Sequence, residues 1–164
     1  KSVYGTGESA VSSSLSKINK NVPFSQTVNF YYPSLNDEKI YYEGKTITFK
    51  TNAASKELLA AAYKASKPAN TGKVFSGNTK INQLYIDDSG IVHLDLNKAF
   101  LTEMNAGAGY ESLILQSLAN TFGEYYNTDK VILTIEGRPY ESGHIAMKAG
   151  ESLKVNYDKV DQLG

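Results

Sequence analysis

The side chains most often used in catalysis are few in this sequence, and their spacing matches no known catalytic motif. The chain has two histidines, His93 and His144, and no cysteine. A metal site would need both imidazoles to converge with a carboxylate, and their sequence positions favour ordinary solvent-facing residues instead. One Ser-x-x-Lys pair, Ser14 and Lys17, lies near the N-terminus without the companion motifs that acyl transfer requires. We therefore predict no catalytic residue, no metal ion and no cofactor.

Two further features resemble functional motifs but have simpler interpretations. Asp87 and Asp88 are adjacent carboxylates, which could suggest general acid-base catalysis. Neighbouring turn residues point in different directions, however, and Asp-Ser-Gly is typical of a hairpin connection. Gly107-Ala108-Gly109 precedes an expected helix, where unpaired amide groups attract phosphate. The third glycine and the preceding strand of a dinucleotide-binding motif are missing, so we interpret this run as a helix start.

Tyrosine is the most unusual component of the sequence, with twelve residues beside no tryptophan. The pairs Tyr31-Tyr32 and Tyr41-Tyr42 fall in expected strands, where successive side chains face opposite ways, so one ring of each pair should lie outside the core. Tyrosine offers a large apolar contact area with a polar tip, which suits protein contacts and stacking against sugar rings. Tyrosine also has a high strand propensity, which leaves an ordinary strand surface as the alternative. We select Tyr31, Tyr41 and Tyr42 as candidate binding residues.

Polar side chains recur at four-residue intervals along the longest expected helix. Gln116, Asn120 and Glu124 form a ridge at the border of its apolar stripe. This ridge could be a solvated helix face, or it could contact a partner, because amide groups form hydrogen bonds without the desolvation cost of full charges. A third possibility is that Asn120 and Thr121 are tied to neighbouring backbone inside the fold. We include Gln116, Asn120 and Glu124 among the candidate binding residues.

The spacing of apolar and turn residues predicts the elements that position these side chains. Two helices and several short strands in mixed order favour a single α+β domain, with a mixed sheet carrying both helices on one face. Such an arrangement leaves the other face of the sheet open. The expected elements are a strand at 26–33, a hairpin at 39–50 turning at Glu43-Gly44, helices at 53–66 and 110–125, a hairpin at 84–96 turning at 87–90, a strand at 131–135, an edge strand at 140–147, and a segment at 153–157 packed on the sheet.

Composition limits the classes of partner and compartment. The 164 residues contain 41% hydrophobic residues, which is enough for one domain with a sizeable core. We divide the chain into a flexible leader at 1–25, a domain at 26–157 and a tail at 158–164. Lysine plus arginine balances aspartate plus glutamate at 17 each, so nucleic acid is not an expected partner. No apolar run approaches the roughly 20 residues of a membrane span, so we expect membrane contact only through an anchor upstream of the first residue.

The segment from Gly107 to Gly137 carries a family resemblance. Its helix start, its Asn-Thr pair and its terminal strand resemble the GerMN domain of sporulation and spore germination proteins, and the similarity extends over roughly residues 26 to 156. The residues that match the family pattern are Gly107, Gly109, Glu111, Leu113, Leu115, Gln116, Asn120, Thr121, Val131, Ile135 and Gly137.

This resemblance implies a fold similar to the ring-building modules of sporulation channels, in which copies of one unit pack side by side. It implies a non-catalytic module of the bacterial cell envelope that mediates protein-protein assembly, with envelope or sporulation proteins as partners and self-association as a possibility. It also implies an extracytoplasmic protein of a Gram-positive bacterium, held at the membrane as a lipoprotein or by a signal anchor. The alternatives are a module that binds peptidoglycan glycans and, least favoured, a cell-wall hydrolase.

Overall fold

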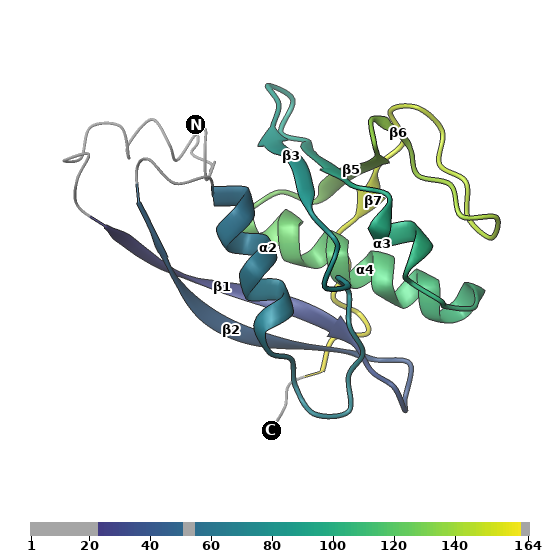
Figure 1. Cartoon of the computed structure of the whole chain (residues 1–164), viewed down its shortest axis with the longest axis horizontal. Coiled ribbons are helices and arrows are strands. Elements are labelled where there is room, and N and C mark those ends of the chain that lie inside the picture. Colours follow the sequence, from purple (N-terminus) through teal and green to yellow (C-terminus); the bar gives the residue numbers. More distant parts are fainter. Residues whose placement is uncertain (1–22, 51–54, 162–164) are drawn as a thin grey trace.

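The helices of this protein lie between a two-stranded β-ribbon and a larger β-sheet (Figure 1). The computed structural model describes residues 23–50 and 55–161. Ser14, Lys17 and most of the predicted leader lie outside the described residues, as do residues 51–54 and 162–164. The elements in chain order are β1 (Phe24–Pro33), β2 (Ile40–Phe49), α2 (Ser55–Ala65), β3 (Ile81–Ile86), β4 (Val92–Leu96), α3 (Ala99–Thr102), α4 (Ala108–Tyr125), β5 (Lys130–Ile135), β6 (Arg138–Pro139) and β7 (Leu153–Lys154).

The β-ribbon consists of β1 and β2, which pair antiparallel along their whole length. The predicted hairpin turn at Glu43-Gly44 is wrong, because both residues lie inside β2. The chain turns instead at residues 34–39, where Ser34 Oγ accepts a hydrogen bond from the backbone N–H of Asn36 at 3.0 Å. A serine side chain that binds the backbone two residues further on is typical of turns. The N-terminal strand and the predicted hairpin therefore form one long ribbon that stays separate from the main sheet.

The main sheet has the strand order β3-β4-β5-β6, with β7 also paired to β5. β4 and β5 run parallel and the other pairs run antiparallel, so the predicted α+β fold with a mixed sheet is confirmed. The predicted hairpin at 84–96 is confirmed as β3 and β4. The predicted edge strand at 140–147 is wrong, because only Arg138–Pro139 pairs with β5 before the chain leaves the sheet. Tyr140 turns into the core there and is fully buried.

α2 and α4 cover one face of the main sheet, as predicted, and the ribbon packs against their other side. α4 therefore contacts β1 on one side and β5 on the other, which explains why it buries residues around most of its circumference. In the described part of the chain, no helix is long and apolar enough to cross a lipid bilayer. The core between the layers includes Phe30, Leu59, Leu94, Leu118, Phe122 and Leu133.

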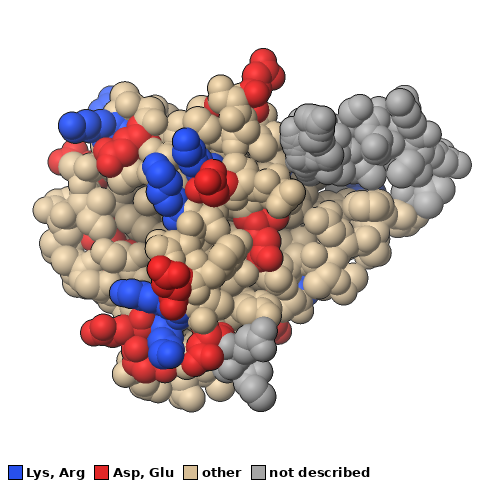
Figure 2. Space-filling model, turned by 180° about the vertical axis from the view of Figure 1, so that it is seen from behind, with Lys and Arg blue, Asp and Glu red and all other residues tan. Residues whose placement is uncertain are grey.

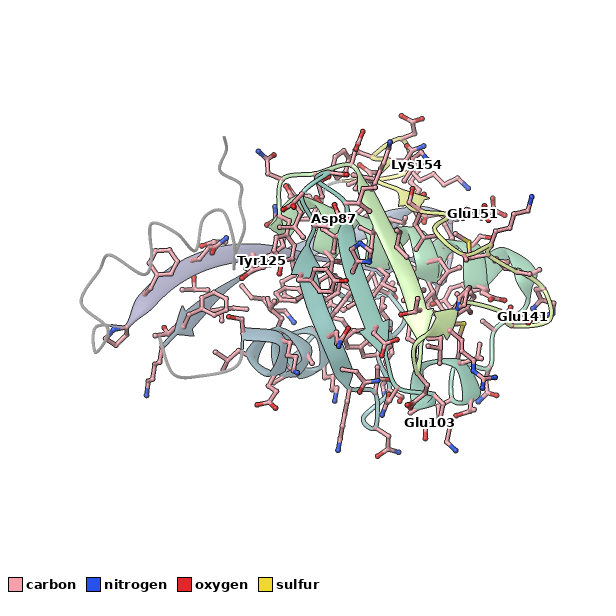
Figure 3. All side chains as sticks on the ribbon, turned by 90° about the horizontal axis from the view of Figure 1, so that it is seen from above. Asp87, Glu103, Tyr125, Glu141, Glu151 and Lys154 are labelled. Carbon is pink, nitrogen blue, oxygen red and sulfur yellow. The ribbon has the colours of Figure 1, made fainter. Side chains whose placement is uncertain are left out.

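The second face of the main sheet is open, and Figure 3 looks onto it with Asp87 labelled at one end of β3 and β4. Within the described residues, no helix crosses this face. In the register of the sheet, Tyr85 lies opposite His93 and His93 lies beside Ile132, so the three form a row across β3, β4 and β5. The alternation of buried and partly exposed residues along β4 and β5 follows directly from having only one covered face.

Candidate interaction surfaces

Three of the predicted binding residues meet where the ribbon, α4 and the C-terminal segment come together. Tyr31 Oη donates a hydrogen bond of 2.7 Å to Glu124 Oε1. The Tyr31 ring lies between the rings of Tyr42 and Tyr157, with centroid distances of 5.3 Å and 5.9 Å. Asn29 Nδ2 approaches both oxygens of Glu124 at 3.4 Å. We call these five residues the tyrosine patch.

The centre of the tyrosine patch is more buried than predicted. Tyr31 is only 3% exposed, so the expectation that this ring faces solvent is wrong. The cause is the packing of α4 and α2 against β1: Tyr31 N–H donates to Thr121 Oγ1 of α4 at 2.9 Å, and Tyr63 Oη of α2 donates to the Tyr31 carbonyl at 2.7 Å. Burial raises the pKa of the Tyr31 hydroxyl, and the hydrogen bond to Glu124 raises it further. Tyr31 therefore remains a neutral hydrogen-bond donor at physiological pH.

Tyr41 does not belong to the tyrosine patch. Its hydroxyl donates a hydrogen bond of 2.7 Å to Asp37 Oδ2 in the turn between β1 and β2. This bond raises the pKa of the Tyr41 hydroxyl. Because successive residues of a strand face opposite ways, the structure brings Tyr42 to Tyr31 and takes Tyr41 elsewhere.

The ridge on α4 binds the C-terminal segment of the same chain. Asn120 Nδ2 donates to the carbonyl of Asn156, whose N–H donates back to Asn120 Oδ1, each at 3.0 Å. Gln116 Nε2 donates to Asn120 Oδ1 at 2.9 Å and to the carbonyl of Lys154 at 2.8 Å. The interpretation of Asn120 as a surface residue is wrong, since it is 0% exposed. Among the three ridge residues only Glu124 is exposed. The third possibility, that Asn120 is tied to neighbouring backbone inside the fold, is therefore the correct one for Asn120.

Glu111 forms a second polar cluster at the start of α4. It is 1% exposed, and its two oxygens accept a hydrogen bond from Tyr140 Oη at 2.6 Å and pair with His144 Nδ1 at 3.0 Å. Burial alone would raise the pKa of Glu111, but hydrogen bonds from Ser142, Tyr140 and His144 outweigh it, so the pKa lies below its ordinary range. This carboxylate ties the segment after β6 to the first turn of α4, where a negative charge also complements the helix dipole.

The open sheet face carries a shallow hollow of about 370 Å³. Tyr85, which is 45% exposed, stacks on His93 with a centroid distance of 4.7 Å and an interplanar angle of 5°. His93 Nε2 lies 2.7 Å from Asp87 Oδ2. Burial would raise the pKa of Asp87, but the contact with His93 and backbone N–H groups lower it. The other oxygen of Asp87 accepts the N–H groups of Ser89 and Ile91, as the turn interpretation requires.

Asp95 lies on the same face, and its carboxylate already accepts hydrogen bonds from within the domain. Its Oδ1 accepts hydrogen bonds from Thr134 Oγ1 at 2.5 Å and from Gly137 N–H at 2.7 Å. Its Oδ2 accepts one from Asn82 Nδ2 at 3.0 Å. Gly137 has a φ of +82° and follows Glu136 at +52°, so glycine permits the tight connection between β5 and β6 that points this N–H at Asp95.

The described residues include no cluster typical of a metal centre, and the rear of the molecule carries charges of both signs. Within the described residues, no group of three or more histidine, cysteine, aspartate or glutamate side chains could hold a metal ion. Figure 2 shows acidic and basic side chains interspersed over the rear of the molecule. The Gly107-Ala108-Gly109 run begins α4: Gly107 is its N-cap residue, and the Gly107 carbonyl accepts the N–H of Glu111 at 2.8 Å.

The comparison with protein families decides the classification. The family Germane, described as "Sporulation and spore germination", matches residues 29–141. The chain belongs to the Germane family. No curated protein matches it. The family residues identified in the sequence lie on α4 and β5 or at their ends, where Glu111, Asn120 and Thr121 tie α4 to the rest of the fold.

Two solved structures of the sporulation protein GerM from Bacillus subtilis share this Germane fold. The first GerMN domain is 20% identical with a TM-score of 0.57, and the match covers 79% of this chain and 97% of that domain. The tandem GerMN domains are also 20% identical, with a TM-score of 0.60, and the match covers 80% of this chain and 46% of the tandem protein. At this identity the likeness concerns the fold.

Sequence reasoning missed three residues of these surfaces. Tyr157, which is 47% exposed, joins the tyrosine patch only because Asn156 is held by α4. Asn29 contacts Glu124 from a strand far away in sequence. Tyr85 is exposed at the start of the row on the open face. The alternation of apolar residues along β3 could have predicted that this ring faces away from the core.

Proposed function

We propose that this domain is a non-catalytic module of the bacterial cell envelope that acts in sporulation or spore germination by binding another envelope protein through the open face of its main sheet. The observation that carries this proposal is the row of Tyr85, His93 and Ile132 across three strands, on a face that no described helix covers. Membership of the Germane family supports a sporulation-related role. Attachment to the membrane through a segment upstream belongs to the same proposal.

The chemistry of the open face suits burial against a protein. Aromatic residues are enriched in interface cores, and Tyr85 presents a ring held in one orientation by its stack on His93. A carboxylate on such a face usually opposes burial because it must lose water. Asp95 already accepts three hydrogen bonds from within the domain, so a partner can cover it at a lower desolvation cost.

Two carboxylates that could act in catalysis have structural roles instead. Asp87 closes the turn between β3 and β4 through two backbone N–H groups. Glu111 lies beneath Tyr140 and holds the segment after β6. A catalytic acid or base must reach a substrate atom, whereas these two carboxylates form hydrogen bonds that hold the fold together. This supports a role in binding rather than in hydrolysis of the cell wall.

Site-specific crosslinking tests the proposed docking face. A photoreactive phenylalanine analogue is placed at position 85 of the membrane-anchored protein in its own sporulating cells, and adducts are identified by mass spectrometry. The matched control carries the same analogue at position 41, a tyrosine on the ribbon that bonds to Asp37. We expect a defined protein adduct from position 85 that is weaker from position 41. Equal adducts from both positions, or none from position 85, would contradict the proposal, and an adduct with a second copy would identify the partner as the domain itself.

Binding to peptidoglycan is a second candidate for the same face. An exposed aromatic ring beside amide side chains is a common platform for sugars, and Tyr85 adjoins Asn82 and Gln83 in the hollow. Sedimentation with purified peptidoglycan distinguishes the two candidates. If glycans are the ligand, the domain should sediment with the polymer, and Tyr85→Ala should remain in solution. If the domain does not sediment at all, the glycan candidate is wrong.

A further inference from the structure

We propose that the tyrosine patch is a binding site for an organic cation, the ammonium or guanidinium group of a lysine or arginine side chain on a partner protein. This site lies on the ribbon, α4 and the C-terminal segment, away from the open sheet face. It combines one exposed carboxylate with the rings of Tyr42 and Tyr157, which pack on the buried ring of Tyr31. Aromatic rings beside a carboxylate are the arrangement that proteins use to bind organic cations, because both the ring faces and the carboxylate attract positive charge.

The carboxylate of Glu124 has only neutral partners in the described part of the chain. Its contacts are the Tyr31 hydroxyl at 2.7 Å and the Asn29 amide at 3.4 Å. The ion pairs among the described residues are Lys39 with Asp161, His93 with Asp87, and His144 with Glu111, and none of them includes Glu124. The side chain is exposed, so a cation from outside can reach it.

The position of Glu124 in its helix strengthens the local negative potential. Glu124 lies in the last turn of α4, where the helix dipole presents its negative end, and residues 122–125 include no lysine or arginine. A negative side chain is unfavourable at that end of a helix, whereas a bound cation would be favourable. Burial raises the pKa of Tyr157, and the charge of Glu124 raises it further, so the field of this carboxylate extends to the exposed ring.

The opposite face of the ribbon holds an ammonium group of the chain itself. Lys45 Nζ lies 5.3 Å from the ring centroid of Phe30. It donates to Tyr32 Oη at 2.8 Å and to the backbone carbonyls of Ala62 and Ser66 at 2.5 Å and 2.6 Å. The ribbon thus already holds one ammonium group beside aromatic rings at the end of a helix, on its core side. On its outer side, no lysine of the described residues occupies the corresponding place beside Glu124.

Titration with capped amino acids tests this inference without knowledge of the partner. The probes are N-acetyl-lysine-methylamide, N-acetyl-arginine-methylamide and the uncharged N-acetyl-norleucine-methylamide, and the readout is the NMR shift of the ring signals of Tyr42 and Tyr157. We expect saturable shifts with the two cationic probes and much smaller ones with norleucine. Glu124→Gln should weaken binding of the lysine probe at least about fivefold at low salt, because it removes the charge and keeps a hydrogen-bond acceptor for Tyr31.

Control variants make the outcome decisive. Glu57→Gln removes an equal charge from an exposed position in the first turn of α2 and should leave the affinity unchanged. If Glu124→Gln unfolds, Tyr157→Leu replaces it, since this exposed ring can lose its aromatic character with little effect on the core. Shifts of equal size with norleucine overturn the proposal. The proposal is also overturned if the lysine probe binds Glu124→Gln as tightly as it binds Glu57→Gln. Where Tyr157→Leu replaces Glu124→Gln, Tyr157→Leu is compared with Glu57→Gln in the same way.

Discussion

Replacement of Asn120 by alanine should detach the C-terminal segment from α4 and lower the free energy of unfolding by about 2 to 4 kcal/mol. The Asn120 side chain is fully buried and takes part in hydrogen bonds with both backbone groups of Asn156 and with Gln116. Each of these bonds contributes about 0.5 to 1.5 kcal/mol net, and a buried group left without a partner costs about 1 to 3 kcal/mol. The three bonds sum to about 1.5 to 4.5 kcal/mol, and because Asn156 is exposed, water replaces part of what its N–H and C=O lose, so the expected loss lies within that range.

Urea unfolding followed by circular dichroism measures this loss, and hydrogen exchange at the Asn156 amide measures the local effect. The control is Ser112→Ala on the exposed side of the same helix, which should change stability by less than about 0.5 kcal/mol. The amide of Asn156 should exchange faster in Asn120→Ala than in the control. A stability loss below about 1 kcal/mol together with unchanged protection at Asn156 would refute the view that this asparagine holds the segment.

Three further substitutions test other parts of the structure. The pKa of Glu111 in the folded protein lies below its ordinary value of 4.5, so its contribution to stability is complete above pH 4.5 and is lost as the pH falls through the folded pKa. The stability difference between the wild type and Glu111→Gln in urea unfolding should therefore shrink on acidification, and a constant difference would count against it. Thr121→Val removes the acceptor for the backbone N–H of β1 and should cost about 1 to 3 kcal/mol in the same assay, whereas a neutral result would mean that the buried N–H finds another partner. Gly123→Ala places a Cβ atom in overlap with Val155 Cγ2 and 3.0 Å from the carbonyl oxygen of Thr128, so it should lower the melting temperature, although alanine normally favours a helix; a rise would show that Val155 and the turn after α4 move aside easily.

The elements with a clear period were predictable because one physical cause decides them. The apolar spacing of α4 and the alternation along β4 and β5 reflect burial against the core, and all three elements were found at nearly their observed positions. The turn of the ribbon was not found, because Glu43-Gly44 has the composition of a turn, whereas Gly44 is in fact a strand residue against which the side chains of Asn29 and Thr27 pack. Local composition does not distinguish these two uses of glycine.

The site residues depended on contacts that no local pattern contains. Tyr31 satisfies the alternation rule for an exposed residue, yet α4 packs along the edge of β1 and buries it. Asn120 lies at the border of an apolar stripe, where solvent and a neighbouring segment are equally consistent with the sequence, and its partner Asn156 is 36 residues away. Periodicity predicts that a face is covered but does not identify what covers it, and the ribbon that forms the third layer was therefore not foreseen.

The residues that match the family pattern also assemble the proposed cation site. Gln116 and Asn120 hold the backbone at Lys154 and Asn156, which brings the next residue, Tyr157, beside Tyr31. Thr121, on the same helix, fixes the backbone of Tyr31 on the other side. The orientation of two of the three rings thus depends on the buried side chains of Asn120 and Thr121 and on the partly buried Gln116, none of which belongs to the tyrosine patch. A substitution at Asn120 should therefore weaken the site by releasing Tyr157, even though Glu124 and its charge stay in place.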